Sequence, residues 1–379
     1  MTEPLTESGA PLQTDVAIVG AGPAGSATAL ALVQRDRSWA GRLLLIDRAH
    51  HPRHKLCGGA ITPLGLEVLE KLGLELEVPH RAPPEMRIRF GGIDQRFFPE
   101  PALRIVHRAE LDAWLLHRAE QDGVRLLQGC AVTDATLDGG TTTLRAGPHT
   151  VLARVVVGAD GSRGPMRRLL GLSRAGQLAR LLEVFTPIGD DERAAGLDRV
   201  ARFDFDAMRD HLQGYCWDFP CMIDGEPAMN RGVFDARVRP ERSRESLPRV
   251  LGAHLQRRGL SLAQVQLEGH PIRWFDPESP IARRGALLVG DAAGVDPLLG
   301  EGISFALQFG RVAAATIDSG FARDDLGFGD YTGRVARDPV LARLRTRHRR
   351  ARLLYGRRPG LVTRALWRLG PAFMRAVYS

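Results

Sequence analysis

Two glycine-rich segments, one near each end of the chain, constrain its fold more than any other feature. The first, DVAIVGAGPAGSATA (15–29), has the pattern of an apolar strand, a tight turn and a helix. Its glycines have the spacing G-x-G-x-x-G, which suits a turn where the backbone approaches a pyrophosphate: Gly20, Gly22 and Gly25. The second, GALLVGDAAGVDPLLGEGI (285–303), is an apolar strand that leads through Asp291 to another helix. A single glycine-rich turn needs no ligand, but the pair predicts one long dinucleotide held at both ends, which favours FAD over NAD.

The order of the expected elements predicts an α/β fold with two domains and a helical tail. The strand after the first helix ends at Asp47, 22 residues beyond Gly25, where a carboxylate can bind ribose hydroxyls. Residues 173–275 change to mixed strands with few glycine-rich turns, which indicates an inserted domain. We therefore expect a Rossmann-like FAD-binding domain (13–85, 100–172 and 276–325), an inserted α+β substrate domain with an antiparallel sheet (86–99 and 173–275), and a basic helical C-terminal segment (326–379).

The net charge of +8 is concentrated in the C-terminal segment. Residues 341–379 contain eleven arginines and no acidic residue, so the rest of the chain is slightly acidic. Apolar side chains recur among these arginines, which favours packed or interfacial helices over a disordered arm: Leu341, Leu344, Leu353, Leu354, Leu361, Leu366, Trp367 and Leu369. The simpler interpretation is two helices packed on the body with their charges in water; the other is peripheral contact with a membrane. We do not expect nucleic acid as a partner.

The apolar runs and the cysteines indicate in which cellular environment the chain is expected to fold. No run approaches 18 apolar residues, so we expect no transmembrane helix, and residues 1–12 resemble neither a signal peptide nor a transit peptide. Four cysteines are scattered without a C-x-x-C spacing, so neither a metal site nor a disulfide framework is predicted: Cys57, Cys130, Cys216 and Cys221. A reduced, cytoplasmic setting is expected, with the basic tail as the candidate for membrane contact.

Three motifs, taken in order along the chain, resemble those of a known fold family. GAGPAG (20–25), GADG (158–161) and GDAAG (290–294) are similar to the segments of the para-hydroxybenzoate-hydroxylase-type FAD-dependent oxidoreductases. The resemblance covers most of residues 13–320, and the triple is far more specific than any one motif.

Two further motifs resemble the geranylgeranyl reductase family within that group. They are PRHKLCGGAITP (52–63) and GYCWDFP (214–220), each where that family places it. The chain departs from the family pattern at Cys221, where a lysine is frequent, and at Phe234, which stands where a second glycine would follow Gly232.

The resemblance and the physics of the motifs together imply a set of cofactor-binding residues. The amino ends of the helices after Gly22 and Gly300 suit the pyrophosphate and the negative charge of a reduced flavin, respectively. Asp291 is expected to bind the ribityl hydroxyls rather than act only as a helix cap, and Arg108 to contact the flavin rather than water; Glu301 is expected to be structural. The full set is Gly20, Gly22, Ala24, Gly25, Asp47, Arg48, Cys57, Gly58, Arg108, Ala131, Asp160, Gly161, Gly290, Asp291, Gly300, Gly302 and Ile303.

Cys57 is the candidate catalytic residue. The resemblance places it near the flavin ring, where a thiol could donate a proton and Lys55 could increase its acidity. The alternatives are a positioning role in the cavity wall and a small apolar core residue. Alternation along a strand puts three aromatic rings on one face, and the motif predicts that they line an apolar substrate cavity with the proline that follows: Tyr215, Trp217, Phe219 and Pro220.

These features predict an FAD-dependent reductase that transfers hydride to carbon–carbon double bonds of an apolar, isoprenoid substrate. The first alternative is a flavin-dependent monooxygenase or halogenase of the same fold, and the second is a non-catalytic, FAD-stabilised lipid-binding protein. The chain has no second G-x-G-x-x-G motif, so the reductant is expected to be NAD(P)H or an electron-transfer protein that docks transiently.

Overall fold

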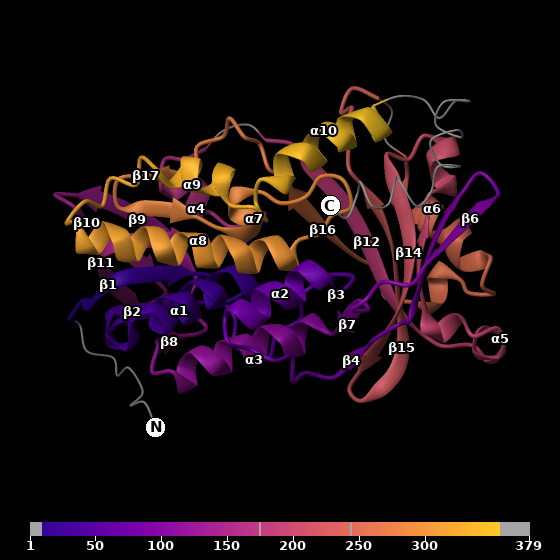
Figure 1. Cartoon of the computed structure of the whole chain (residues 1–379), viewed down its shortest axis with the longest axis horizontal. Coiled ribbons are helices and arrows are strands. Elements are labelled where there is room, and N and C mark those ends of the chain that lie inside the picture. The colour runs from indigo at the N-terminus through magenta and orange to yellow at the C-terminus, as the bar shows by residue number, and fades with distance from the viewer. Residues whose placement is uncertain (1–9, 174–175, 243–244, 357–379) are drawn as a thin grey trace.

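The computed structural model describes residues 10–173, 176–242 and 245–356, and it contains two large sheets side by side (Figure 1). The nucleotide-binding sheet has the order β17 (Ala282–Arg283), β18 (Ala286–Leu288), β11 (His149–Gly158), β1 (Leu12–Val19), β2 (Leu43–Ile46) and β8 (Arg125–Leu127), and β10 (Thr141–Ala146) joins β11 to β9 (Val132–Asp138). The central pairings are parallel. Because parallel strands are buried on both faces, these strands read as nearly continuous apolar runs.

Helices cover the parallel sheet: α1 (Pro23–Arg35), α2 (Pro63–Lys71), α3 (Arg108–Gln121) and α8 (Ile303–Ala322), with the 3-10 helix η1 (Arg37–Arg42) and the short α4 (Met166–Leu169) and α7 (Gly290–Ala293) between strands. Glycine lets α1 and α8 pack closely, because a Cβ on Gly310 would lie 2.9 Å from the Ala24 carbonyl oxygen. The two motifs that are most distant in the sequence are thereby brought side by side (Figure 1).

The second sheet is mostly antiparallel. Its order is β16 (Glu268–Arg273), β12 (Leu178–Pro187), β15 (Glu226–Asp235), β14 (Gly214–Ile223), β13 (Val200–Asp204), β5 (Glu85–Phe90) and β6 (Ile93–Phe97). The hairpin β5–β6 thus joins strands from residues 178–273, and β13 pairs with β5 in parallel. A three-stranded sheet completes the structure: β3 (Ala60–Ile61), β7 (Arg104–Val106) and β4 (His80–Arg81).

The two faces of the second sheet have different partners. One face packs on α6 (Leu247–Gln256). Pro248 lies in the first turn of this helix, where a proline costs no helical hydrogen bond. On this face the Asp218 carboxylate accepts from Arg231 at 2.6 Å and lies 3.1 Å from a His254 ring nitrogen. The other face carries an aromatic cluster that includes Tyr215. Short helices complete the periphery: α5 (Asp190–Ala194), η2 (Leu197–Arg199), η3 (Asp206–Asp210) and η4 (Leu262–Gln264).

The C-terminal part of the described chain forms α9 (Tyr331–Arg337) and α10 (Arg343–Tyr355). The interpretation that these helices keep their charges in water is wrong for Arg347, which is buried between two carboxylates. Leu361, Leu366, Trp367 and Leu369 lie outside the described residues. Among residues 10–173, 176–242 and 245–356, no helix has the length and apolar character needed to cross a bilayer.

Candidate active site

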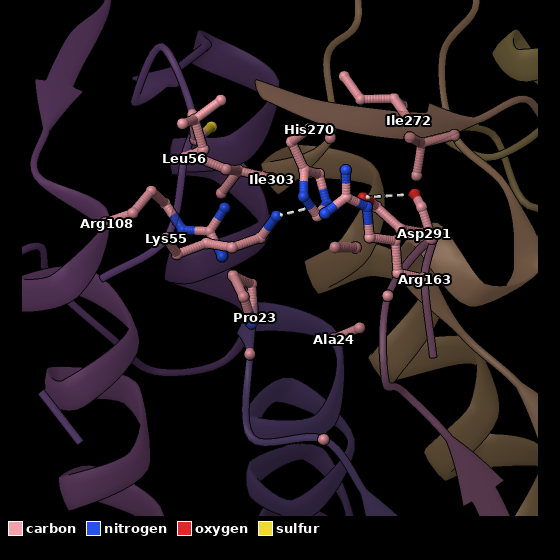
Figure 2. A pocket seen from close by; sticks show the side chains of 18 of the residues that line it. Pro23, Ala24, Lys55, Leu56, Arg108, Arg163, His270, Ile272, Asp291 and Ile303 are labelled. Atoms are coloured by element: carbon pink, nitrogen blue, oxygen red, sulfur yellow. Dashed lines mark hydrogen bonds between the residues drawn. The ribbon is translucent and has the colours of Figure 1, made fainter. Parts of the chain in front are cut away.

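One cavity of about 530 Å³ joins the glycine-rich motifs to the aromatic strand. This volume is within the range of ligand and cofactor sites. Figure 2 shows Ala24, Lys55 and Asp291 around the cavity. It brings together most of the residues that the sequence singled out: Gly20, Gly22, Ala24, Asp47, Arg48, Cys57, Gly58, Arg108, Ala131, Asp160, Gly161, Tyr215, Trp217, Phe219, Asp291, Gly300, Gly302 and Ile303. Residues from the two large sheets and from the loops between them therefore face one space.

Three predicted site residues do not line this cavity. A Cβ on Gly25 would lie 1.8 Å from the Gly20 carbonyl oxygen, so Gly25 permits the turn and helix to pack. Gly290 has φ +56, and a Cβ there would lie 2.7 Å from the Ala24 Cβ. Pro220 follows Phe219 on β14, and since successive side chains alternate between faces, its ring is directed away from the aromatic wall. The prediction that Pro220 lines the cavity is therefore wrong.

Asp47 stands at the nucleotide end of the cavity. Its carboxylate accepts the Ala21 N–H at 2.7 Å and the Ala49 N–H at 2.9 Å. Burial alone would raise the pKa of Asp47, but the His51 ring nitrogen at 3.6 Å and hydrogen bonds from these two N–H groups lower it to about 2. The carboxylate is therefore ionised at neutral pH and fixed in position, and its remaining lone pairs suit ribose hydroxyls.

The donors and acceptors of the cavity fit FAD. Gly22 and Gly302 are the N-cap residues of α1 and α8. Because neither supplies a side-chain cap, the amino ends of these two long helices are open for anionic groups. A Cβ on Gly302 would be 3.6 Å from an Asp291 oxygen, which leaves room for a close ligand. Asp160 has a buried carboxylate oxygen without a hydrogen-bond partner, and burial raises the pKa of this carboxyl to about 6. The site therefore offers anion-binding ends and unused acceptors for hydroxyl groups.

The loop before α8 is held from both sides. Glu301 accepts from the Thr62 hydroxyl at 2.6 Å and from Arg347 of α10 at 2.6 Å. The same Arg347 atom lies 2.8 Å from Asp296, and the Tyr355 hydroxyl donates to the Leu298 carbonyl at 2.7 Å. These contacts give Glu301 the structural setting expected of it, and they show that α10 positions the loop that carries Gly300 and Gly302.

Cys57 has cationic neighbours. Arg108 donates two hydrogen bonds of 2.8 Å to Asp112, and it lies near enough to Cys57 to interact electrostatically with its thiol. Although burial opposes it, these partners raise the pKa of Arg108 above its usual value. Arg108 is 8% exposed, so the alternative of a surface arginine is wrong. A thiolate at position 57 would therefore face a fixed positive charge.

Lys55 and His270 lie side by side in the cavity wall (Figure 2). The Lys55 Nζ is 2.8 Å from the His270 Nε2. Burial lowers the pKa of Lys55. The pKa of His270 is lowered to about 3 by its own burial and by four nearby cations: Lys55, Arg163, Arg108 and Arg48. His270 is therefore neutral and can accept a hydrogen bond from Lys55.

The aromatic wall meets the Cys57 loop directly. A Cβ on Gly58 would lie 3.2 Å from the Phe219 ring and 3.5 Å from the Trp217 Nε1, so only glycine fits without displacing them. Tyr215 donates its hydroxyl to the Leu299 carbonyl at 2.5 Å. The apolar end of the cavity is therefore continuous with the loops around Cys57 and Gly300.

Sequence reasoning missed several residues at this site. His270, Asn230 and Glu183 stand in segments without a recognisable motif, whereas Arg163 comes two residues after the GADG motif. The pairing of β12 with β15 and β16 brings Glu183 and Asn230 behind the Cys57 loop. The acidic Glu183 between apolar residues of LARLLEVFTP gave a signal in the sequence.

The comparisons with known proteins agree with this geometry. Residues 13–188 match the family model described as an FAD binding domain. The menaquinone reductase of Mycobacterium tuberculosis is 32% identical over 344 residues, which cover 80% of this chain and 76% of that protein. The digeranylgeranylglycerophospholipid reductase 2 of Methanopyrus kandleri is 28% identical over 325 residues, with 83% and 79% covered.

The fold also matches a solved structure. A geranylgeranyl bacteriochlorophyll reductase-like protein from Thermoplasma acidophilum superposes with a TM-score of 0.75 at 20% identity, over 92% of this chain and 88% of that one. The expectations of fold class and of FAD as cofactor are confirmed. The chain is an FAD-dependent oxidoreductase, and it belongs to the geranylgeranyl reductase family of the para-hydroxybenzoate-hydroxylase-type flavoproteins.

Proposed function

We propose that this protein reduces carbon–carbon double bonds in the isoprenoid chain of an apolar substrate. The observation that carries the proposal is the contact of the Cys57–Gly58 loop with Trp217 and Phe219 inside the cavity that the nucleotide-binding motifs also line. The names of the relatives point to the same class of substrate, since menaquinone and digeranylgeranylglycerophospholipid both carry isoprenoid chains.

The aromatic wall would supply most of the substrate affinity. Tyr215, Trp217 and Phe219 present rings to the cavity, and the hydroxyl of Tyr215 is already used by the Leu299 carbonyl. Burial of a methylene group is worth about 0.8 kcal/mol, so a chain of a few isoprene units gains ample binding energy without polar contacts. Such a wall would select substrates by the length and shape of the isoprenoid chain rather than by the head group.

Cys57 would supply the proton. When bound and reduced, the cofactor would supply the hydride for one carbon of the double bond, and the other carbon would then need a proton. We assign this proton to the Cys57 thiol, whose S–H bond breaks as the new C–H bond forms. Arg108, fixed by Asp112, would stabilise the thiolate that remains, and Lys55 provides a second positive charge nearby.

The test is an anaerobic single-turnover experiment. The FAD-loaded protein is reduced with dithionite, mixed with menaquinone or a geranylgeranyl lipid without oxygen, and the lipids are analysed by mass spectrometry. A gain of two mass units with reoxidation of the flavin supports the proposal. A product that forms only with oxygen would show the monooxygenase or halogenase alternative to be correct, and failure to reoxidise with any unsaturated lipid would favour a lipid-binding protein.

Two predictions about partners remain proposals. The reductant would be NAD(P)H or an electron-transfer protein that binds transiently. Peripheral membrane contact would use the basic C-terminal helices, of which α10 exposes Arg345, Arg349 and Arg352.

A further inference from the structure

Asn230 is a buried amide on the face of the second sheet that carries the aromatic wall. It stands on β15, is 2% exposed, and lies directly opposite Phe219 of β14 in the register of the two strands. Because residues directly opposite each other in an antiparallel pair point to the same face, the Asn230 side chain lies on the face of the Phe219 ring. A buried amide has N–H donors and an acceptor to satisfy, so its partners indicate its role.

The Asn230 amide connects the aromatic wall to the Cys57 loop. Its oxygen accepts from the Trp217 indole N–H at 2.7 Å, and its nitrogen donates to the Cys57 carbonyl at 3.0 Å. An indole N–H only donates and a carbonyl only accepts, so these two partners fix the orientation of the amide. Cys57 is 173 residues from Asn230 along the chain. One side chain thus ties the indole to a loop that is distant in the sequence.

The space around the Trp217 ring is as restricted as its N–H group. Gly232 lies opposite Trp217 in the register, and a Cβ on Gly232 would be 2.2 Å from the ring. On the Cys57 loop, a Cβ on Gly58 would lie 3.5 Å from the Trp217 Nε1. The indole therefore packs on two glycines while its N–H points to Asn230, and it lines the cavity in this orientation.

The place of a substrate along the cavity depends on the shape of this wall. An isoprenoid chain repeats one apolar unit, so no polar group distinguishes one of its double bonds from the next. We propose that Asn230 is a positioning residue that holds the Trp217 indole against the Cys57 loop and thereby determines which double bond lies beside Cys57. The inference rests on the proposed function, because it specifies how the same cavity selects among double bonds.

Loss of the Asn230 amide would release both of its partners. The Trp217 N–H and the Cys57 carbonyl would be left without this hydrogen bond, and the indole would regain side-chain rotations that the native structure excludes. With a mobile indole, the chain would slide by one isoprene unit and present neighbouring double bonds to Cys57. A purely structural amide would instead lower stability without changing the choice of double bond.

The first measurement needs no lipid. The chain has five tryptophans, so their indole N–H signals can be resolved by NMR of the FAD-loaded, oxidised protein after isotope labelling of tryptophan. Trp217→Phe identifies the Trp217 signal by its absence. In the wild type this proton should exchange slowly with water. In Asn230→Leu, where an apolar side chain of similar size replaces the amide, it should exchange at least about tenfold faster.

The second measurement locates the double bond that is reduced. Each FAD-loaded protein is reduced with dithionite and given a geranylgeranyl lipid without oxygen for a single turnover, and fragmentation in the mass spectrometer locates the added hydrogens. The wild type should favour one double bond. In Asn230→Leu and in Trp217→Phe this preference should fall about tenfold, which corresponds to about 1.4 kcal/mol of lost discrimination, the size of one hydrogen bond.

Thr186→Val is the matched control. Thr186 is 2% exposed on β12 of the same sheet, and it accepts from Arg231 at 2.9 Å on the face that packs on α6. Thr186→Val also removes a buried hydrogen bond, so it should lower stability but change neither the Trp217 signal nor the reduced position. Retention of FAD absorbance shows that each variant has folded.

Two results would overturn the inference: slow exchange of the Trp217 proton in folded Asn230→Leu, or an unchanged choice of double bond in folded Asn230→Leu or Trp217→Phe. Trp217→Phe keeps the test decisive where Asn230→Leu does not fold. A wild type that forms no reduced lipid would refute the proposed function and with it the choice among double bonds. The exchange rate would still confirm or refute the hold of Asn230 on Trp217.

Discussion

The Arg347 guanidinium of α10 lies 2.6 Å from the Glu301 carboxylate, and the Asp296 carboxylate is 2.8 Å from the same nitrogen. One cation of α10 therefore bridges two buried acids of the segment that carries Gly300 and Gly302. The basic tail thus contributes to the cofactor site, because without this charge the two carboxylates would repel each other at the start of α8.

Arg347→Ala should destabilise the protein and weaken its hold on FAD. Removal of one partner from a buried ion pair costs about 3–5 kcal/mol, since the remaining charges stay buried without compensation. Urea unfolding measures the first effect and release of fluorescent FAD the second. Arg345→Ala, on the exposed side of the same helix, should change neither. Equal free energies of unfolding for the two variants would contradict this assignment.

Asp291→Ala should abolish stoichiometric FAD binding while the fold is retained. Asp291 lines the cavity and accepts from the Ser162 hydroxyl at 3.2 Å, a long hydrogen bond on which little of the fold depends. The ratio of flavin absorbance to protein absorbance in the purified variant is the measurement. Asp134→Ala, on an exposed part of β9, is the control and should stay yellow. Full flavin content in Asp291→Ala would contradict the prediction that Asp291 binds the ribityl hydroxyls.

Cys57→Ser should keep FAD but slow reduction of the double bond by about 10²–10⁴-fold, the usual contribution of a general acid. The hydroxyl fits in place of the thiol but is a far weaker acid. Rapid-mixing measurement of flavin reoxidation by the lipid gives the rate. An unchanged rate would show that Cys57 is not the proton donor and that its role is that of a residue of the cavity wall.

Tyr215→Phe should lower stability by about 1 kcal/mol, because the half-buried Leu299 carbonyl loses its donor. Tyr331→Phe is a matched control, since the Tyr331 hydroxyl donates to the buried Leu288 carbonyl at 3.0 Å, away from the cavity lining. Both variants should unfold at lower urea concentration. Only Tyr215→Phe should also raise the KM for the lipid, and a similar KM for both variants would contradict a role of Tyr215 in the substrate wall.

Glu183→Gln should flatten the pH dependence of stability. The folded pKa of about 8 is raised by burial above the usual 4.5, so between these values the folded protein holds a proton that the unfolded chain has released. Stability from this group is therefore lost as pH rises through that window, at a slope of up to about 1.4 kcal/mol per pH unit. Urea unfolding at pH 5, 6, 7 and 8 measures the slope. Parallel profiles for wild type and variant would show that Glu183 ionises normally.

The nucleotide-binding half of the site could be predicted from local sequence. Strand β1, the turn at Gly20 and Gly22, and helix α1 follow one another without interruption. The second motif was located correctly, but its helix α8 begins at Ile303 rather than at Gly300, because Gly300 adopts φ +70 in the turn that precedes it. Alternation along β14 likewise identified the three aromatic residues and should have excluded Pro220.

Sequence alone determined the dinucleotide-binding turns, the cofactor and the aromatic strand, because each depends on residues that are neighbours along the chain. Tertiary structure alone decided which charges meet: Arg347 with Glu301, Lys55 with His270, Arg108 with Cys57, and Glu183 with the Cys57 peptide. Charged side chains carry no periodic pattern that reveals their partners. Their ionisation depends on burial and on neighbours contributed by distant strands, and only the folded chain provides both.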